Sequence, residues 1–358
     1  MPSANRILLA SAGSGKTTTI VSEAAKEHGV RSALVTYTNN SEAELRIKAN
    51  GICGCVPPHL RTATWFGFLL QHLVRPYQRA AYARRVRGLA FVNGMSARWT
   101  KEADTQRHYF ERPGDIYVDK VSKFACKLIR VTRGKPVERL AQIVDRIYVD
   151  EVQDLAGYDL DLIEHLMDSN IQVVLVGDHR QATFKTNQSG RNRQFGRQRI
   201  IDKFKEWQVG GRAEIEIHSH SYRCVQQICD VADSLFPDVE RTISRNHKRT
   251  GHDGVFLVRQ RDVPAYVEKF SPQTLRYSRR KRNVPGNPYN FGEAKGMTFE
   301  RVLIFPHKPL EKYCLTRKLE DAGKELPKIY VAMTRARQSV GIVVPNRTEG
   351  GIARIHEA

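Results

Sequence analysis

The sequence predicts an α/β fold with two domains, each a parallel sheet covered by helices on both faces. Short, mostly uninterrupted apolar runs alternate with helix-like runs along the 358 residues. They read RILLASA, SALVTYT, RIYVDE and QVVLVGD in the first half, and GVFLV, RVLIFP and SVGIVV in the second. A glycine pair, Gly210-Gly211, separates the two blocks just before AEIEIHS, which restarts the alternation. We therefore expect one domain over residues 1–211 and another over 212–358.

Helices are expected after most of these strands. One follows the first strand near residues 16–27, and SEAELRIKAN begins another with Ser41 and Glu44 as a capping box. Further helices are predicted near 158–168 and from about Arg223 to Phe236. Two segments interrupt this alternation of strands and helices. We interpret residues 77–140 as an Arg-rich insertion in the first domain and residues 240–290 as a loop-rich, basic insertion in the second.

The charge of the chain predicts a polyanionic partner. The formal net charge is +20, and residues 45–101 hold ten Lys or Arg and no Asp or Glu. Residues 179–201 and 269–292 also lack acids and carry six basic residues each. General surface basicity would explain the net charge but not the exclusion of acids, so nucleic acid is the favoured partner.

The apolar runs are strand-sized, which predicts no membrane span and no membrane partner. Six scattered cysteines without a disulfide spacing suit a reducing compartment, so we expect a cytoplasmic protein. Cys53, Cys55 and His59 resemble half of a zinc site, but no second ligand pair stands at a usual spacing.

The stretch ASAGSGKTTT, Ala10 to Thr19, has the pattern of a phosphate-binding loop between a strand and a helix. Its nucleotide-binding residues are expected to be Ala12, Gly13, Ser14, Gly15, Lys16, Thr17 and Thr18. The backbone N–H groups would face phosphate oxygens and Lys16 would reach the β- and γ-phosphates. The Thr17 hydroxyl would bind Mg²⁺.

Such a loop needs an acidic partner, and IYVDE supplies two carboxylates at the end of a strand. Asp150 is predicted to bind Mg²⁺, and Glu151 to orient and deprotonate the attacking water. The alternative is an acidic first turn that complements a helix dipole. The later acids, Asp159 to Asp168, are interpreted as a solvated helix face.

The box DEVQD resembles that of superfamily 1 helicases, in particular the UvrD/Rep-like family. Seven other boxes occur in that family's order: ASAGSGKT, LVTYTNN with AELRIK, TWFGFLLQHL, VVLVGDHRQ, HSYRCVQQI, GEAKGMTFERV and IYVAMTRA. The resemblance implies two RecA-like P-loop domains that bind ATP and Mg²⁺ between them. It also implies an ATP-dependent helicase or translocase that moves 3′ to 5′ along single-stranded DNA or a tailed duplex.

Site roles follow from the same resemblance. Gln181 would sense the γ-phosphate, and Arg223 and Arg335 would be arginine fingers. The adenine would stack on Tyr222, and Thr298 would lie near the nucleotide where the family has an acidic residue. Nucleic-acid contacts are implied at Tyr37, Thr38, Asn39, Thr64, Trp65, Phe184 and Lys295.

Two alternatives stay open. Tyr37 and Trp65 could equally be core aromatics at strand ends. The accessory insertions are far shorter than in UvrD-like enzymes, which favours a second function. In that case the chain would be a nucleic-acid-activated ATPase switch without robust unwinding, paired with a protein such as a phage-defence nuclease.

Overall fold

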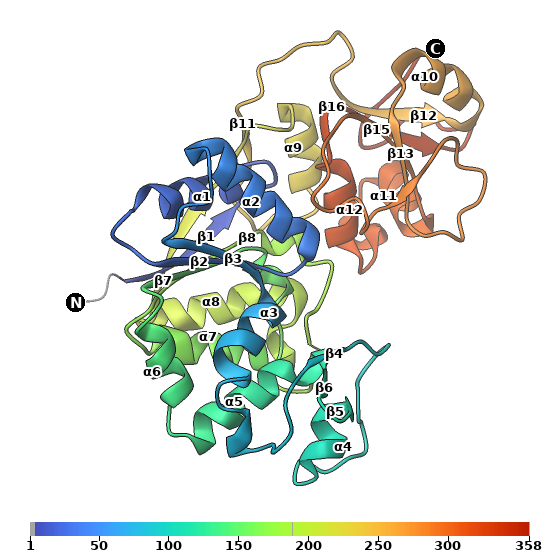
Figure 1. The fold of residues 1–358 in the computed structure, drawn as a ribbon. Coiled ribbons are helices and arrows are strands. Elements are labelled where there is room, and N and C mark those ends of the chain that lie inside the picture. The colour runs from blue at the N-terminus through green and yellow to red at the C-terminus, as the bar shows by residue number, and fades with distance from the viewer. Residues whose placement is uncertain (1–3, 188, 358) are drawn as a thin grey trace. The chain divides into compact units, whose positions relative to one another are not determined.

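The computed structural model describes residues 4–187 and 189–357. Its internal contacts divide the chain into two units. The first holds residues up to Leu9 together with Lys16–Ile217, and the second holds Ala10–Gly15 together with the residues from His218 onward. Each unit contains a six-stranded sheet with helices on both faces (Figure 1). The predicted α/β class is therefore confirmed.

The sheet of the first unit has the strand order β3-β2-β7-β8-β1-β9. These strands are β1 (Asn5–Ala10), β2 (Ser32–Thr36), β3 (Leu60–Thr64), β7 (Arg146–Val149), β8 (Gln172–Gly177) and β9 (Ala213–His218). The β1–β8, β8–β7, β7–β2 and β2–β3 pairs are parallel. The strands β1 and β7 run parallel with only β8 between them. The loop after β1 and the acids after β7 therefore lie close together at the carboxyl ends of the strands.

Alternate residues of these strands face two separate cores. One face packs against α1 (Lys16–Lys26) and α2 (Asn39–Cys53). The other face packs against α3 (Trp65–Leu69), α5 (Val121–Val131), α6 (Lys135–Ala141), α7 (Tyr158–Met167) and α8 (Ile200–Val209) (Figure 1). The helices predicted near 16–27 and 158–168 are thus confirmed as α1 and α7.

Two local predictions in this unit are corrected. The strand AEIEIHS was expected to open the second domain, but as β9 it extends the first sheet beside β1. Alternation along the chain does not say which sheet a strand joins. The predicted capping box at Ser41 and Glu44 is also wrong, because α2 begins earlier. Its N-cap is Thr38, whose hydroxyl accepts a hydrogen bond from the Ser41 N–H at 3.1 Å.

The Arg-rich segment at about 77–140, predicted as an insertion, contains a small sheet of its own with the order β4-β6-β5. Its last part forms α5 and most of α6, which pack in the core of the first unit. Its strands have three residues each: β4 (Gly88–Ala90), β5 (Phe110–Arg112) and β6 (Asp115–Tyr117). The helix α4 (Thr105–Tyr109) precedes β5. Phe110 joins this sheet to the first core, since it stacks on Tyr82 at 3.9 Å between ring centroids and contacts Phe124 of α5.

The sheet of the second unit has the order β14-β13-β15-β16-β12-β17, with every pair parallel among the described residues. Its strands are β12 (Gly254–Arg259), β13 (Gln273–Arg276), β14 (Tyr289–Asn290), β15 (Phe299–Phe305), β16 (Ala336–Val344) and β17 (Arg354–Ile355). One face packs against α9 (Gln226–Asp233), α11 (Lys308–Thr316) and α12 (Leu326–Met333), and the other against α10 (Val263–Phe270).

The interpretation of residues 240–290 as a loop-rich insertion needs correction. Between Gly254 and Arg276 this segment supplies β12, α10 and β13, which are integral to the second sheet. The run GVFLV was predicted as a strand and is β12, whereas α10 and β13 were not predicted. No helix among the described residues is long and apolar enough to cross a membrane.

The interpretation of the acids of α7 as a solvated face fails at Asp159. This carboxylate is fully buried and accepts hydrogen bonds from the Trp65 indole N–H at 2.8 Å and from the Ser122 and Thr186 hydroxyls. Burial raises its pKa, and the hydroxyl and indole donors oppose that rise. Asp159 therefore joins α3, α5 and the segment after β8, three parts of the first unit far apart in the chain.

We expect Asp159→Leu to destabilise the first unit strongly. The substitution leaves the Trp65 N–H and the Ser122 and Thr186 hydroxyls without their acceptor, and each unmet buried donor costs about 1–3 kcal/mol. Urea denaturation should show a loss of several kcal/mol in unfolding free energy. Asp168→Leu, an exposed acid at the end of the same helix, is the control, and its expected loss is about 1 kcal/mol or less. Equal effects of the two variants would contradict the buried role of Asp159.

Candidate functional site

The loop between β1 and α1 has the backbone of a phosphate cradle. Gly13 and Gly15 have φ angles of 77° and 80°, in the left-handed region that glycine adopts at no steric cost. Helix α1 begins at Lys16, so the N–H groups of the loop and of the first helical turn lie where an anion can bind. The geometry fits the nucleotide phosphates predicted at Ala12–Thr18.

The same loop is held by the segment that follows β9, and both belong to the second unit. The Ser221 hydroxyl donates to the Ala12 carbonyl at 2.7 Å, and the Tyr222 N–H donates to the Gly13 carbonyl at 2.9 Å. A Cβ at Gly13 would collide with the Cβ of Arg223. Gly13 is thus required by close packing as well as by its φ angle.

Two pairs of side chains join the start of α1 to the end of β7. The Lys16 ammonium lies 3.0 Å from a Glu151 carboxylate oxygen. The Thr17 hydroxyl donates to Asp150 Oδ2 at 2.9 Å, although 133 positions separate the two residues. The structure therefore brings together the four residues on which the predicted chemistry depends.

These buried charges shift one another's pKa values. Burial lowers the pKa of Lys16, but the carboxylates of Glu151, Asp150 and Asp178 outweigh it and the net pKa is raised. Burial raises the pKa of Asp150, and the Lys16 charge opposes this. Lys16 is therefore held as a cation in a site crowded with carboxylates, which suits it for binding phosphate.

Glu151 has a strained backbone. Its φ of 58° is uncommon for a residue with a side chain, and such strain costs about 1–3 kcal/mol and gathers at functional sites. The side chain is partly exposed, and one carboxylate oxygen accepts a hydrogen bond from Gln153 Nε2. A carboxylate held in this way can accept a proton from a water molecule.

Gln153 and Asp178 connect this acid to Gln181, and neither was singled out from the sequence. The Asp178 N–H donates to Gln153 Oε1 at 3.2 Å, and Gln181 Nε2 donates to Asp178 Oδ2 at 3.0 Å. Although burial alone would raise the pKa of Asp178, Arg180 and His179 lower it below its usual range. Both residues lie in motifs that the sequence analysis quoted: Gln153 is the glutamine of DEVQD, and Asp178 is the aspartate of VVLVGDHRQ. A chain of contacts thus runs from Glu151 to Gln181.

Magnesium and nucleotide fit the residues present. Thr17 and Asp150 offer the hydroxyl and carboxylate oxygens that Mg²⁺ takes alongside phosphate oxygens and water. The glycine loop offers backbone N–H groups, and Lys16 a charge, to the phosphates.

The remaining nucleotide-site predictions fall in the second unit. Tyr222 is exposed, as a residue that stacks on a base must be. Arg223 donates to the Thr334 carbonyl at 3.1 Å. Arg335 is only 2% exposed and donates to the carbonyls of Val331 and Met297 at 3.2 and 3.3 Å. Thr298 is partly exposed just before β15. Arg335 therefore has a structural role within its own unit.

The predicted nucleic-acid contacts divide by exposure. Trp65 is 1% exposed, with its indole bonded to Asp159, so its ring belongs to the core in this structure. Thr38 and Thr64 are the N-caps of α2 and α3. Tyr37 is partly buried against Phe66. Thr38, Asn39 and Phe184 are exposed, and Thr64 and Lys295 are partly exposed.

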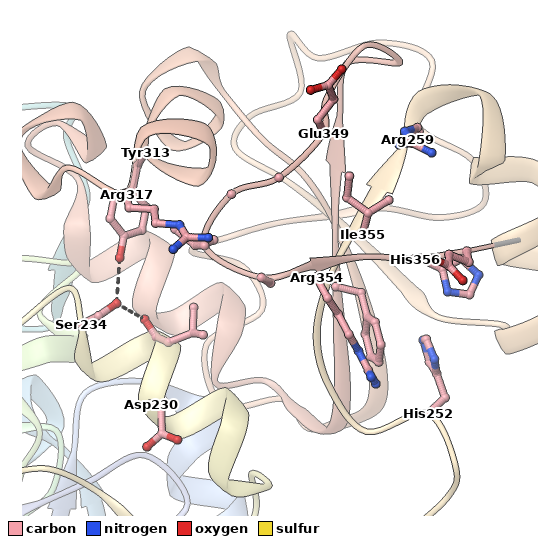
Figure 2. A pocket seen from close by; sticks show the side chains of 17 residues that line it. Asp230, Ser234, His252, Arg259, Tyr313, Arg317, Glu349, Arg354, Ile355 and His356 are labelled. Carbon is pink, nitrogen blue, oxygen red and sulfur yellow. Dashed lines mark hydrogen bonds between the residues drawn. The ribbon is translucent and has the colours of Figure 1, made fainter.

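A cavity of about 1210 Å³ lies elsewhere in the second unit (Figure 2). Asp230, Arg259, Arg317, Glu349 and Arg354 are among its lining side chains. His252 at its margin is stacked between Phe256 and Phe270, and burial lowers its pKa to about 4. None of the predicted site residues lines this cavity, and its basic and acidic groups nearly balance.

Two family comparisons match large parts of the chain. Residues 1–186 match the AAA domain family, and residues 127–344 match the viral superfamily 1 RNA helicase core domain. Each match covers more than half of the 358 residues. Among curated proteins, no sequence matches this chain.

Similar solved structures include the helicase of PRRSV and the arterivirus nonstructural protein 10, a helicase, in complex with DNA. The first is 14% identical with a TM-score of 0.47, and the match covers 96% of this chain and 53% of that one. The second is 17% identical with a TM-score of 0.48, with coverage of 97% and 63%. This chain thus spans between about half and two thirds of these proteins.

Proposed function

The chain belongs to the superfamily 1 helicase family, and we propose that it hydrolyses ATP with Mg²⁺ in order to move along single-stranded nucleic acid. The observation that carries this proposal is the pair of contacts between α1 and the end of β7. Lys16 meets Glu151 at 3.0 Å, and Thr17 meets Asp150 at 2.9 Å. A phosphate loop alone suits many nucleotide binders, whereas a neighbouring Asp-Glu pair favours hydrolysis of the γ-phosphate.

Each residue has a proposed task. Lys16 and the loop N–H groups bind the phosphates, and Thr17 with Asp150 holds Mg²⁺, which neutralises phosphate charge when it is bound. Glu151 accepts the proton of the attacking water, while Gln153 fixes its carboxylate. Gln181 reports the state of the nucleotide to the rest of the first unit; its hydrogen-bonded connection to Glu151 through Asp178 and Gln153 supports this task.

Arg223 and Arg335 stay proposed arginine fingers, and Tyr222 stays the proposed adenine platform. Arg335 supports the proposal less directly than Arg223, because its guanidinium already hydrogen-bonds carbonyls of its own unit. A guanidinium binds phosphate oxygens in a fork and stays protonated, which suits either position for this role.

The proposed substrate is a single strand or a tailed duplex. The resemblance to UvrD/Rep-like enzymes favours DNA and 3′ to 5′ movement. The match to the viral RNA helicase family supports RNA as well, so both nucleic acids are to be tested. The net charge of +20 supports either polyanion.

We expect ATP hydrolysis to rise on addition of single-stranded nucleic acid, and a 3′-tailed duplex to be unwound in preference to a 5′-tailed one. The measurement is hydrolysis and strand displacement with matched DNA and RNA substrates that carry either tail. Hydrolysis that ignores every nucleic acid would refute the proposal. Unwinding from 5′ tails would refute the UvrD-like direction alone.

A second function is favoured by the small size of the accessory sheet, whose strands have only three residues each. In this alternative the chain is a nucleic-acid-activated ATPase switch that serves a protein partner such as a phage-defence nuclease. Stimulated hydrolysis without strand displacement from either tail, in the experiment above, would favour it.

A further inference from the structure

The segment between β4 and α4 exposes large apolar side chains that the proposed function has not used. Trp99 is 87% exposed and Phe91 79% exposed, and Val92 and Met95 are exposed as well. The two other tryptophans of the chain, Trp65 and Trp207, are buried with their indoles bonded to Asp159 and Glu164. Four large apolar side chains exposed within nine residues make this segment a candidate interaction site.

The segment is anchored on both sides of Trp99. Ser96 is buried, and its N–H and hydroxyl donate to the two carboxylate oxygens of Asp119 at 3.1 and 2.5 Å. The Thr100 hydroxyl donates to the Ala97 carbonyl at 2.9 Å. The Thr100 carbonyl in turn contacts His108 Nδ1 at 3.0 Å. Held in this way, Trp99 is presented with little freedom left to lose on binding.

The charge around the segment is positive. The Arg98 guanidinium lies 5.0 Å from the centre of the Trp99 ring, and Arg84, Arg85 and Lys101 are exposed. Two nearby acids already have partners: Asp119 accepts a hydrogen bond from Ser96, and Glu102 pairs with Lys123 at 2.9 Å. A cation beside an exposed aromatic ring suits a strand that offers base faces and phosphates.

We propose that the segment Phe91–Trp99 is a binding surface for single-stranded nucleic acid. Trp99 stacks on an unpaired base, Phe91 offers a second aromatic face, and Arg98 with Lys101 contacts phosphates. This inference rests on the proposed function in one respect, that the ligand is a nucleic acid. A protein partner is disfavoured because residues 45–101 hold ten basic residues and no acid, which fits a polyanion better than a mixed protein surface.

The test uses the full chain and fluorescein-labelled oligo(dT) and oligo(U), with affinity measured by fluorescence anisotropy. Stacking on one base contributes about 1–3 kcal/mol, so Trp99→Ala should weaken binding by about 5- to 150-fold. Trp99→Phe should keep most of the affinity because it keeps an aromatic face. Val209→Ala removes another highly exposed apolar side chain, on α8, and is the matched control with unchanged affinity.

Intrinsic fluorescence gives a second readout. Because Trp65 and Trp207 are buried, quenching by the oligonucleotide should come from Trp99 and disappear in Trp99→Phe. Arg98→Ala should reduce the salt dependence of binding, with a slope smaller by about 0.7 per lost phosphate contact.

The outcomes separate the two proposals. If the wild-type chain binds neither oligonucleotide, the proposed function fails together with this surface. If the wild type binds and Trp99→Ala binds equally well, this surface is overturned and the proposed function stands. Thermal melting of each variant shows whether a weaker affinity reflects unfolding, and Trp99→Phe keeps the test decisive if the alanine variant unfolds.

Discussion

Replacing Glu151 by glutamine is expected to slow ATP hydrolysis by about 10²–10⁴-fold, the contribution of a positioned general base. The amide keeps the size of the side chain and its contact with Gln153, but it cannot take a proton from water. Nucleotide binding should persist, because Lys16, Thr17 and Asp150 are unchanged. The ion pair of Lys16 with Glu151 at 3.0 Å is lost, so the lysine is left with Asp150 and Asp178 as its acidic neighbours.

The measurement is phosphate release under saturating ATP and Mg²⁺, with a fluorescent nucleotide analogue for binding. Glu27→Gln, a partly exposed acid just beyond the end of α1 that pairs with Arg146, is the matched control and should hydrolyse at the wild-type rate. A Glu151→Gln variant with wild-type turnover would show that another group activates the water. Loss of binding together with turnover would assign Glu151 to holding Lys16 instead.

Replacing Arg223 by alanine is expected to reduce turnover by roughly 10³–10⁵-fold, as the loss of an arginine finger does. Arg335→Ala should differ by lowering thermal stability as well. Its guanidinium is buried and bonded to the carbonyls of Val331 and Met297, which would lose their donors. Turnover and melting temperature, measured on the same preparations, separate the two roles.

The control for this pair is Arg337→Ala, two residues further along the chain. Arg337 is exposed and lies 3.5 Å from Glu300, a surface pair that contributes little. Its turnover and stability should match the wild type. If Arg335→Ala lowers stability but leaves turnover intact, Arg335 is a structural residue and Arg223 is the remaining candidate finger.

The sequence alone predicted the α/β class, the phosphate loop and the two acids that end RIYVDE, because these depend on local patterns. The spacing of Gly13 and Gly15 predicts the phosphate loop, because a loop that needs positive φ angles favours glycine at those positions. Likewise, short apolar strands between helices predict parallel sheets whichever order the strands take. Strand order also decides that the loop and the acids meet, as in the 2.9 Å contact of Thr17 with Asp150.

Only the tertiary structure decided which polar and aromatic groups are buried. Trp65 looked equally like a base-stacking residue and a core residue, and Asp159 looked like part of a solvated face. Each is buried because the other is its partner, 94 positions away, and no local pattern carries that information. Trp99 is exposed for the converse reason: the short segment that carries it is held by Asp119 through Ser96, and the Trp99 side chain stays 87% exposed with the Arg98 guanidinium 5.0 Å from its ring centre.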